Sequence, residues 1–241
     1  MALSLSGKTV LITGSTDGLG KALATKLLEQ HAHVIIHGRS QEKIDQTINE
    51  LRELYPTHVI HSLLCDLTDT DAVKREFSTI KTLDILVNNA GVWLDGATTN
   101  ASLEKIEELT RTNILGPLLI TRILLPVLLH SDFAQVINTV SIAGVEIPSG
   151  YYHTIYSATK FGMQGFTEGL AKEFYNKNLR VMGYYPGGMQ TDLFKKAGDD
   201  YKTHEPWMFS TDESVEAILF MLTRNKKVAI KRMDLINQLE E

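Results

Sequence analysis

Two side chains that can exchange protons stand four residues apart, Tyr156 and Lys160 in Tyr-Ser-Ala-Thr-Lys, and Ser141 lies a short way upstream. Residues at i and i+4 project from one face of a helix, one turn apart. A lysine cation favours the phenolate, so a tyrosine that ordinarily titrates near about 10 is expected to work closer to neutral pH. The spacing therefore indicates an acid–base pair. Chance placement of a packed tyrosine beside a solvated lysine gives the same spacing, so the surrounding elements must decide.

These elements alternate along the chain. Short apolar, β-branched runs follow longer amphipathic stretches, and the runs are nearly continuous in apolar residues, as strands buried on both faces require. The pattern predicts an α/β fold, a single-domain Rossmann-type doubly wound parallel sheet with helices on both faces. The expected strands span residues 9–13, 34–37, 59–64, 83–87, 135–140, 179–185 and 228–230. The expected helices span about 19–30, 41–54, 69–80, 102–130, 155–176 and 212–222.

Composition excludes several classes of function. The 241 residues are 43% hydrophobic and 22% charged, which fits one large globular domain over 1–241. The net charge of -5 and the lack of long like-charge blocks favour neither a nucleic-acid nor a membrane partner. The longest uninterrupted apolar run, Ile123 to Leu129, is too short to span a bilayer.

The compartment is inferred from two features of the sequence. Its single cysteine, Cys65, cannot form an internal disulfide and is expected at the end of a buried strand rather than in a catalytic role. The first residues lack the apolar core of a signal peptide. We therefore expect a cytoplasmic protein, and we predict no metal site.

A glycine-rich turn follows the first expected strand, in Thr13-Gly-Ser-Thr-Asp-Gly-Leu-Gly20. Glycine permits backbone angles that other residues avoid and lets a phosphate approach the main chain. The helix N-terminus behind the turn offers free N–H groups and the positive end of a dipole. At this place in a βαβ pattern the turn predicts a dinucleotide site, with a tight turn that binds nothing as the alternative.

Together these motifs resemble those of the short-chain dehydrogenases/reductases over nearly the whole chain. The family's order and nearly its spacings are found in Thr-Gly-x-x-x-Gly-x-Gly at 13–20, Asn88-Asn-Ala-Gly91, Asn113, Ser141, Tyr156-x-x-x-Lys160 and Pro186-Gly187. The glycine spacing and the chain length resemble the short oxidoreductase form rather than the longer sugar-nucleotide epimerase form.

The resemblance implies an NAD(P)-dependent oxidoreductase that interconverts a carbonyl and an alcohol. Ser141 would hydrogen-bond the substrate oxygen, and Tyr156 would be the general acid for reduction and the base for oxidation. Lys160 would lower the Tyr156 pKa and hold the nicotinamide ribose hydroxyls. Asn113 would support a water that links Lys160 to solvent. The hydride chemistry belongs to the nicotinamide, while the protein supplies position and a proton.

The resemblance also implies the cofactor-binding residues: Gly14, Ser15, Thr16, Asp17, Gly18, Leu19, Gly20, Arg39, Asp66, Leu67, Asn89, Ala90, Gly91, Tyr156, Lys160, Pro186, Gly187 and Thr191. Asn88 to Gly91 follow the fourth strand at the edge where open α/β sheets bind ligands, and their side chains are also expected to brace adjacent strand ends. Asp66 matches an adenine-side Asp of the family. Its alternative role is to cap the helix that starts near Asp69.

The end of the second strand indicates which nicotinamide is used. An acidic residue there would take the ribose 2′-hydroxyl of NAD and repel a phosphate. This chain has His37-Gly38-Arg39-Ser40, without a carboxylate, and Arg39 can grip a phosphate through two hydrogen bonds. We therefore expect NADP(H) as the preferred cofactor and NAD(H) as the alternative, a preference that Asp17 in the glycine turn weakens.

Two segments are expected to decide the substrate. Residues 187–210 break the alternation and include Trp207-Met-Phe. A long irregular segment in a compact domain is usually functional, so we predict a substrate lid, with a disordered surface loop as the alternative. Ser141 and Tyr156 are 15 residues apart, slightly more than the family usually shows. The extra length around 146–153 should shape the pocket and makes Tyr152 and His153 candidates for substrate contact.

The expected partners are a small-molecule carbonyl or alcohol and further copies of this chain, as a homodimer or homotetramer. The 102–130 and 155–176 helices resemble those that pair family members, and their apolar candidates for an interface are Leu115, Leu118, Leu119, Ile123 and Phe166. Trp93, Tyr185 and Met189 favour a fairly apolar pocket. The alternative function is a catalytically silent NADP(H)-binding regulatory or scaffold protein, and a third is an isomerase or dehydratase that keeps its nicotinamide bound.

Overall fold

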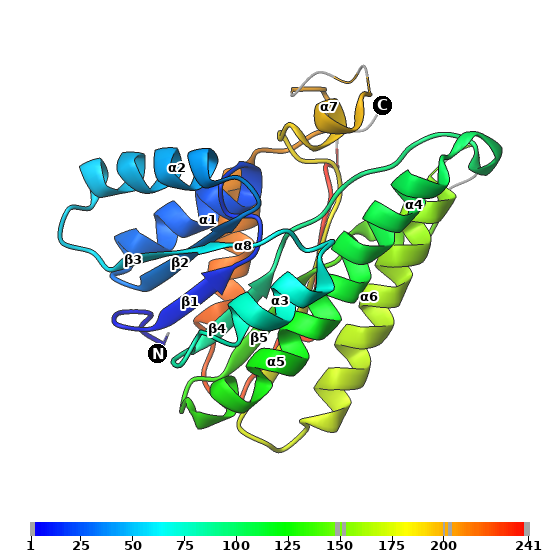
Figure 1. Ribbon diagram of the computed structural model, residues 1–241. Coiled ribbons are helices and arrows are strands. Elements are labelled where there is room, and N and C mark those ends of the chain that lie inside the picture. Colours follow the sequence, from blue (N-terminus) through cyan, green and yellow to red (C-terminus); the bar gives the residue numbers. More distant parts are fainter. Residues whose placement is uncertain (1–2, 148–149, 151–152, 200, 202–203, 239–241) are drawn as a thin grey trace.

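A seven-stranded, wholly parallel sheet runs through the molecule in the order β3-β2-β1-β4-β5-β6-β7 (Figure 1). The computed structural model describes residues 3–147, 150, 153–199, 201 and 204–238. The strands are β1 Thr9–Ile12, β2 His33–Gly38, β3 Ile60–Leu64, β4 Ile85–Asn88, β5 Gln135–Thr139, β6 Arg180–Pro186 and β7 Arg232–Leu235. The doubly wound parallel sheet predicted from the alternating pattern is thereby confirmed.

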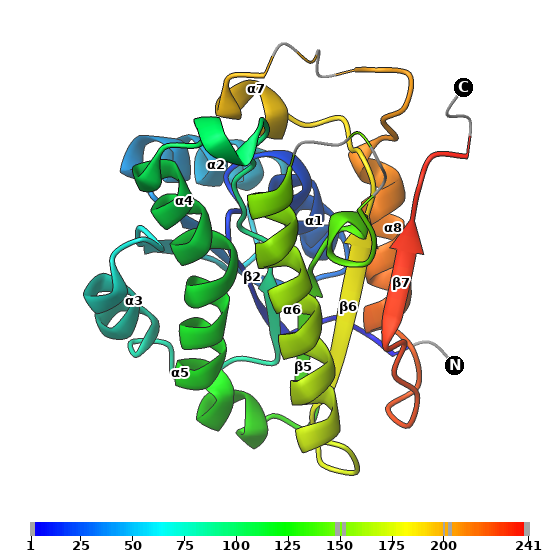
Figure 2. The same ribbon diagram turned by 90° about the vertical axis from the view of Figure 1, so that its right-hand side faces the viewer.

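Helices cover both faces of this sheet (Figure 2). One face carries α1 Gly18–Glu29, α2 Gln41–Leu54 and α8 Thr211–Leu222. The other carries α3 Thr70–Phe77, α4 Leu103–Thr110, the π-helical turn η2 Arg111–Leu115, α5 Gly116–His130 and α6 Thr154–Glu173. Shorter pieces are η1 Thr98–Asn100, η3 Ile142–Gly144 and α7 Leu193–Ala197.

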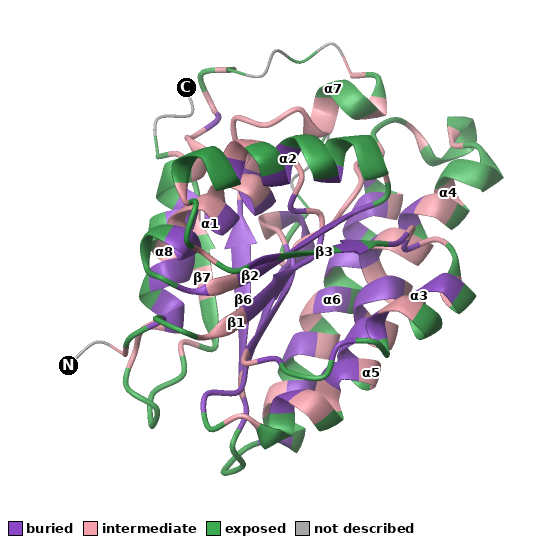
Figure 3. Ribbon diagram, turned by 60° about the vertical axis from the view of Figure 1, so that its left-hand side comes forward, coloured by how far each residue is buried: buried purple, intermediate pink, exposed green. Residues whose placement is uncertain are grey.

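Alternate residues of the central strands supply two hydrophobic cores, one on each face. In β1, Val10 and Ile12 pack toward α1 and α8, while Leu11 packs toward α3 and α5. All three side chains are fully buried, and burial deepens toward the middle of the sheet (Figure 3). The nearly continuous apolar runs in the sequence are explained by this two-sided burial.

The long helix expected over residues 102–130 is continuous but contains the η2 turn, a π-helical insertion centred on Asn113. The whole helix, Leu103–His130, is long and apolar enough to cross a membrane by length and composition alone, with a mean hydropathy of 1.7 over its most apolar window. Core helices pass the same test, and 44% of that window is buried inside the fold. Here α5 packs against α3 and contributes Ile120, Leu124 and Leu128 to the core.

The last strand is displaced from its expected position. The sequence predicted residues 228–230, whereas β7 pairs with β6 from Arg232 onward. Arg180 explains the difference, because its guanidinium donates hydrogen bonds to the carbonyls of Leu222, Arg224, Asn225 and Val228. These bonds hold the chain up to Val228 as a turn, so strand pairing starts only after it.

The sheet order reverses between β1 and β4. From β1 the chain winds outward to β2 and β3, and then returns to β4 on the other side. Ligands of open α/β sheets bind at such a reversal, beyond the carboxyl ends of the strands. The glycine turn after β1 and Asn88 at the end of β4 therefore lie at the edge where a site is expected.

Candidate active site

The glycine turn joins β1 to α1 and requires glycine at several positions. Gly14 and Gly18 adopt left-handed φ values of 65° and 48°. A Cβ on Gly20 would lie 2.3 Å from the Gly14 carbonyl oxygen, so the turn and the first helical residues pack without side chains between them. Asp17 caps α1, accepting a hydrogen bond from the Gly18 N–H at 2.7 Å.

Three other predicted cofactor residues of this turn face inward. Ser15 and Leu19 are buried, and the Ser15 hydroxyl accepts a hydrogen bond from the His37 N–H at 2.9 Å. Thr16 lies against Gly38, where a Cβ would come within 2.8 Å of its methyl group. Ser15, Thr16 and Leu19 therefore pack the inner side of the turn. Its tight backbone is formed by Gly14, Asp17, Gly18 and Gly20.

Asn89 and Thr13 fasten the turn to β4. Asn89 donates from Nδ2 to the carbonyls of Thr13 and Gly14, and the Thr13 hydroxyl accepts from the N–H groups of Asn89 and Ala90. Ala90 also packs against Gly14, where a Cβ would lie 3.0 Å from the Ala90 Cα. The expectation that this motif braces neighbouring strand ends is confirmed.

Ser141, Tyr156 and Lys160 converge at the carboxyl end of β5. Ser141 opens η3, and its Oγ accepts a hydrogen bond from the Ala143 N–H at 3.1 Å. Tyr156 and Lys160 occupy successive turns of α6, only 6% and 5% exposed. Lys160 Nζ lies 5.6 Å from the centroid of the Tyr156 ring. The sequence spacing thus corresponds to a group of three neighbouring side chains, in which Tyr156 and Lys160 are buried and Ser141 is partly exposed.

Two backbone features fix this group. Lys160 Nζ donates to the Thr139 carbonyl at 3.1 Å, which ties α6 to the end of β5. A Cβ on Gly144 would lie 2.6 Å from the Lys160 carbonyl oxygen, so a glycine there lets η3 pack directly on α6. This close packing of η3 on α6 places Ser141 near Tyr156.

The pKa of Tyr156 differs from the expectation. Burial raises the Tyr156 pKa to about 12, and a hydrogen bond with Ser141 opposes the rise only in part. Burial also lowers the Lys160 pKa, to about 8. Both shifts have one cause, because desolvation penalises a phenolate and an ammonium alike. The predicted lowering of the Tyr156 pKa by Lys160 is therefore wrong, and the phenol stays protonated near neutral pH.

Asn113 links the candidate catalytic group of Ser141, Tyr156 and Lys160 to the segment after β4. Its Oδ1 accepts from the Val92 N–H, and its Nδ2 donates to the Val92 carbonyl, both at 2.8 Å. Gly91 lies between this side chain and the lysine, since a Cβ there would be 3.5 Å from Asn113 Oδ1 and 3.8 Å from Lys160 Nζ. The π-helical turn presents Asn113 at this point, as such turns often do at functional sites.

Beyond β2 and β3 lies an open cleft lined by Arg39, Asp66, Thr68, Glu104, Glu107, Glu108 and Arg111. Arg39 is exposed and pairs with Glu108 at 3.2 Å. Arg111 donates to the Thr68 carbonyl and pairs with Glu107, both at 3.4 Å. Sequence reasoning missed Arg111 and the three α4 glutamates, because only the fold brings α4 opposite β2. The cluster of charged residues at 104–111 was the feature of the sequence that could have pointed to them.

Asp66 does not cap α3. Asp69 does so, accepting from the N–H groups of Asp71 and Ala72. Asp66 instead accepts hydrogen bonds from the Thr68 N–H and hydroxyl at 2.9 and 2.8 Å. The capping alternative is therefore wrong, and Asp66 lines the cleft. Leu67, also predicted to bind cofactor, is buried in the α3-side core.

The segment 186–199, which follows β6, contacts the glycine turn. Thr191 lies against it, since a Cβ on Gly18 would be 3.3 Å from the Thr191 methyl group. Lys196 of α7 pairs with Asp17. Burial alone would raise the Asp17 pKa, but the hydrogen bonds from Lys196 and Gly18 outweigh it and lower the pKa. Pro186 ends β6 and Gly187 bonds through its N–H to Leu235.

An aromatic wall stands over Tyr156. Trp93 packs on Tyr156 with ring centroids 4.4 Å apart, on His153 at 5.3 Å and on Phe194 at 4.9 Å. Its indole N–H donates to Asp199 at 2.6 Å. Phe194 continues the wall to Trp207 at 5.6 Å. His153, a predicted substrate contact, thus lies beside Tyr156, while Tyr152 falls outside the described residues.

Two further expectations concern cysteine and metal. Cys65 is buried, and burial raises its pKa to about 11, so its thiol stays protonated and unreactive near neutral pH. In the described ranges, no group of three or more His, Cys, Asp or Glu side chains is arranged to hold a metal ion.

Similar proteins place this geometry in a family. The chain matches the short chain dehydrogenase family over residues 8–202. The 3-oxoacyl-[acyl-carrier-protein] reductase FabG of Aquifex aeolicus (strain VF5) is 32% identical over 231 residues, 92% of each chain. An uncharacterized oxidoreductase of Staphylococcus aureus (strain USA300) is 31% identical over 234 residues, 95% of this chain and 96% of that relative.

Solved structures agree in fold. An alcohol dehydrogenase from the archaeon Thermococcus sibiricus, complexed with 5-hydroxy-NADP, superposes with a TM-score of 0.87 at 20% identity, over 98% of this chain and 99% of that one. L-sorbose reductase from Gluconobacter frateurii, complexed with NADPH and L-sorbose, gives 0.85 at 24% identity, over 98% and 97%. With the family match over most of its length, the chain belongs to the short-chain dehydrogenases/reductases and is an NAD(P)-dependent oxidoreductase.

Proposed function

We propose that this oxidoreductase uses NADP(H) to interconvert a carbonyl and an alcohol, with Tyr156 as the acid and base. The observation that carries the proposal is the Ser141–Tyr156–Lys160 group at the carboxyl end of β5, in which Tyr156 and Lys160 are buried, on the edge that also holds the glycine turn. The named relatives and the nicotinamide complexes of similar folds support the reaction class.

The residues at this edge fit a dinucleotide. The N-terminus of α1 offers amide N–H groups behind the glycines at 14, 18 and 20. The cleft beyond β2 holds two guanidinium groups, those of Arg39 and Arg111. When bound, the nicotinamide would supply or accept the hydride. Lys160 is the side chain proposed to hold its ribose hydroxyls, and Asn113 is proposed to support a water that links Lys160 to solvent.

The proton part of the reaction follows from the chain's own groups. In reduction, Tyr156 would donate its phenolic proton to the substrate oxygen as the carbonyl carbon takes up a hydride and the C=O π electrons move onto that oxygen, and Ser141 would donate a hydrogen bond to the same oxygen. The raised Tyr156 pKa of about 12 keeps this proton in place near neutral pH, which suits the acid role. Reduction leaves Tyr156 as a phenolate, which Lys160 stabilises. Oxidation reverses each step, with this phenolate accepting the proton of the alcohol.

Cofactor preference rests on Arg39. It is exposed at the end of β2, where an NAD-selective protein would carry a carboxylate, and a guanidinium suits a 2′-phosphate. Glu108 already pairs with Arg39, so a phosphate must displace this carboxylate. We therefore propose a preference for NADP(H) that still admits NAD(H).

The substrate, location and assembly are also proposals. We propose that the substrate is a small, largely apolar carbonyl compound or alcohol, because Trp93, Phe194 and Trp207 form an aromatic wall beside Tyr156. Residues 187–210 are proposed as the lid over it. The interface candidates on α5 and α6 stay partly exposed, which supports a homodimer or homotetramer: Leu118, Leu119, Ile123 and Phe166. A cytoplasmic location remains an expectation.

The test is a panel of ketones, aldehydes and hydroxy acids followed by NADPH absorbance, with Tyr156→Phe as the decisive variant. We expect Tyr156→Phe to lose at least ~10²-fold in kcat while NADPH affinity stays within twofold, because only the proton donor is removed. Tyr175→Phe, at an exposed tyrosine just after α6, should change neither kcat nor NADPH affinity.

Two outcomes would contradict the proposal. Turnover unchanged in Tyr156→Phe would remove the tyrosine from the chemistry. Wild-type protein that binds NADPH but reduces no compound, with a biological effect that survives Tyr156→Phe, would favour the scaffold alternative. For the cofactor, Arg39→Asp should shift the ratio of kcat/KM for NADPH over NADH toward NADH by at least ~10-fold, and an unchanged ratio would refute the role of Arg39.

A further inference from the structure

The imidazole of His37 lies directly behind the glycine turn. His37 is the fifth residue of β2, and its side chain is only 3% exposed. Its Nδ1 accepts a hydrogen bond from the Gly14 N–H at 3.0 Å. Its backbone N–H donates to the Ser15 hydroxyl at 2.9 Å, and its carbonyl accepts from the Ser15 N–H at 3.0 Å. One residue of β2 thus makes three hydrogen bonds to two successive residues of the turn.

Gly14 is held from two sides by side chains. Its N–H donates to His37 from the β2 side, and its carbonyl accepts from Asn89 Nδ2 at 3.3 Å from the β4 side. The left-handed φ of 65° turns this residue out of the β1 ladder, so strand neighbours no longer offer backbone partners in register. Two side chains replace the missing ladder, and the turn keeps one shape.

The bond requires one protonation state of the ring. Because the Gly14 N–H is the donor, Nδ1 must be unprotonated, and the proton of the neutral ring is on Nε2. Burial lowers the His37 pKa to about 4, while the Cys65 backbone and the negative charge of Asp66 oppose the shift. Phe77 of α3 packs on the ring at 5.5 Å.

We infer that His37 is a positioning residue for nucleotide binding: its Nδ1 holds the Gly14 peptide so that the glycine turn is already shaped when the cofactor arrives. The imidazole is neutral near neutral pH, so Nδ1 can accept this hydrogen bond there. The inference rests on the proposed function only in assigning the glycine turn to the nucleotide. His37 itself is buried behind the turn and acts through Gly14.

Matched substitutions separate the acceptor from packing. His37→Phe keeps a ring of similar size but removes the acceptor, leaving a buried N–H without a partner. His37→Asn keeps an acceptor oxygen at nearly the position of Nδ1 and gives up ring volume. Phe77→Leu loosens the packing on the ring but leaves the Gly14 bond intact. For each, NADPH Kd, KM, kcat and the unfolding midpoint would be measured.

The expected result is a split between these variants. His37→Phe should raise the Kd and KM for NADPH by ~10-fold or more, with kcat at saturating NADPH within twofold of wild type. His37→Asn should stay within threefold in Kd. Phe77→Leu should lower the unfolding midpoint yet leave Kd within twofold.

Several results would overturn the inference. His37→Phe that folds and binds NADPH within twofold of wild type would do so, as would equal losses in His37→Phe and His37→Asn. If His37→Phe does not fold, His37→Gln replaces it, because its amide oxygen lies one bond too far and should lose affinity where His37→Asn does not. Wild-type protein that binds no NADPH would instead contradict the proposed function, since the His37 comparison presupposes that binding.

Discussion

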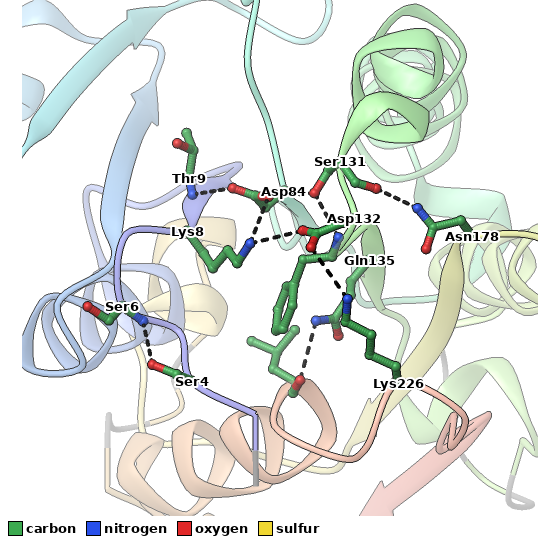
Figure 4. Close-up of polar contacts among 12 residues, drawn as sticks. Ser4, Ser6, Lys8, Thr9, Asp84, Ser131, Asp132, Gln135, Asn178 and Lys226 are labelled. Atoms are coloured by element: carbon green, nitrogen blue, oxygen red, sulfur yellow. Dashed lines mark hydrogen bonds and ion pairs between the residues drawn. The ribbon is translucent and has the colours of Figure 1, made fainter.

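The two ends of the parallel sheet use lysine in opposite ways. At the amino end, Lys8 pairs with Asp84 at 3.6 Å and with Asp132 at 3.2 Å, and Asp84 also accepts hydrogen bonds from the Thr9 N–H and the Ser131 hydroxyl (Figure 4). At the carboxyl end, Lys160 is more deeply buried, and its contacts are neutral: the Thr139 carbonyl and the Tyr156 ring.

The difference separates a structural cluster from the candidate catalytic group. A half-buried lysine between two carboxylates stabilises a fold, whereas a buried lysine without a counter-charge destabilises it. Within the described residues, Lys160 forms no ion pair, and burial lowers its pKa to about 8. Stability alone therefore gives no reason for a buried lysine at this position. The proposed reaction would give one.

Replacing Lys160 by Met tests this comparison most directly. We expect kcat to fall by at least ~10²-fold, because the partner of the phenolate is lost. We also expect the free energy of unfolding at pH 7 to rise by about 1–3 kcal/mol, because an unpaired buried ammonium is removed. Enzyme assays and denaturant titrations measure the two effects.

The pH dependence of that gain has a definite sign. The folded pKa of Lys160, about 8, lies below its ordinary value of 10.5, so the unfolded chain binds its proton more tightly. Wild-type stability should rise from this group between pH 8 and 10.5, and the advantage of Lys160→Met should shrink over the same window. An advantage that is constant with pH, or a loss of stability at pH 7, would show that Lys160 is not an unpaired cation in the fold.

Gly20→Ala should disrupt the carboxyl end through sterics. The new Cβ would lie 2.3 Å from the Gly14 carbonyl oxygen and 2.8 Å from Asn89 Nδ2, so the turn must move. We expect NADPH affinity to fall by at least ~10-fold, together with a loss of stability of about 1–3 kcal/mol. Gly165→Ala, on the exposed side of α6 with nothing within 4 Å of its Cβ, is the matched control for affinity. Equal NADPH affinities in both variants would contradict the tight packing of the turn.

At the amino end, Asp84→Ala should affect stability without affecting catalysis. The Thr9 N–H and the Ser131 hydroxyl lose a charged acceptor, and Lys8 loses one of its partners. We expect a loss of about 2 kcal/mol and a fall of about 4–8 °C in Tm. Both kcat and the KM for NADPH should stay within twofold of wild type. A change in KM comparable to that of Gly20→Ala would remove the distinction between the two ends.

Much of the fold could be predicted because its signals are local. Runs such as Val10 to Ile12 are apolar at every position because helices cover both faces of the sheet. The glycine turn could be recognised in the sequence because Gly14 adopts a left-handed backbone conformation that favours glycine. The residues of the candidate catalytic group were likewise predicted, since their spacing sets them on one helix face and beside η3.

The misses come from contacts between distant segments. Arg180 holds four carbonyls of the chain after α8, which delays β7, and no local pattern encodes this. Arg111 and Glu108 lie near the end of β2 only in the folded chain, because the cleft joins segments that are far apart in the sequence. The Tyr156 pKa was predicted from the neighbouring charge alone, whereas burial, which depends on the whole fold, has the larger effect.

The smallest expected effect concerns the pair between Lys196 and Asp17, which joins α7 to the glycine turn. Both side chains are about half exposed, so the pair should contribute at most about 1 kcal/mol and weaken as salt rises. Lys196→Ala should therefore change NADPH affinity by less than ~5-fold at low salt, and the change should vanish near 0.5 M salt. Asp17→Asn should behave alike, and the double variant should add little to either single one. A larger, salt-independent loss in Lys196→Ala alone would mean that Lys196 contacts the nucleotide itself, and residues 187–210 would then belong to the cofactor site rather than to a lid above it.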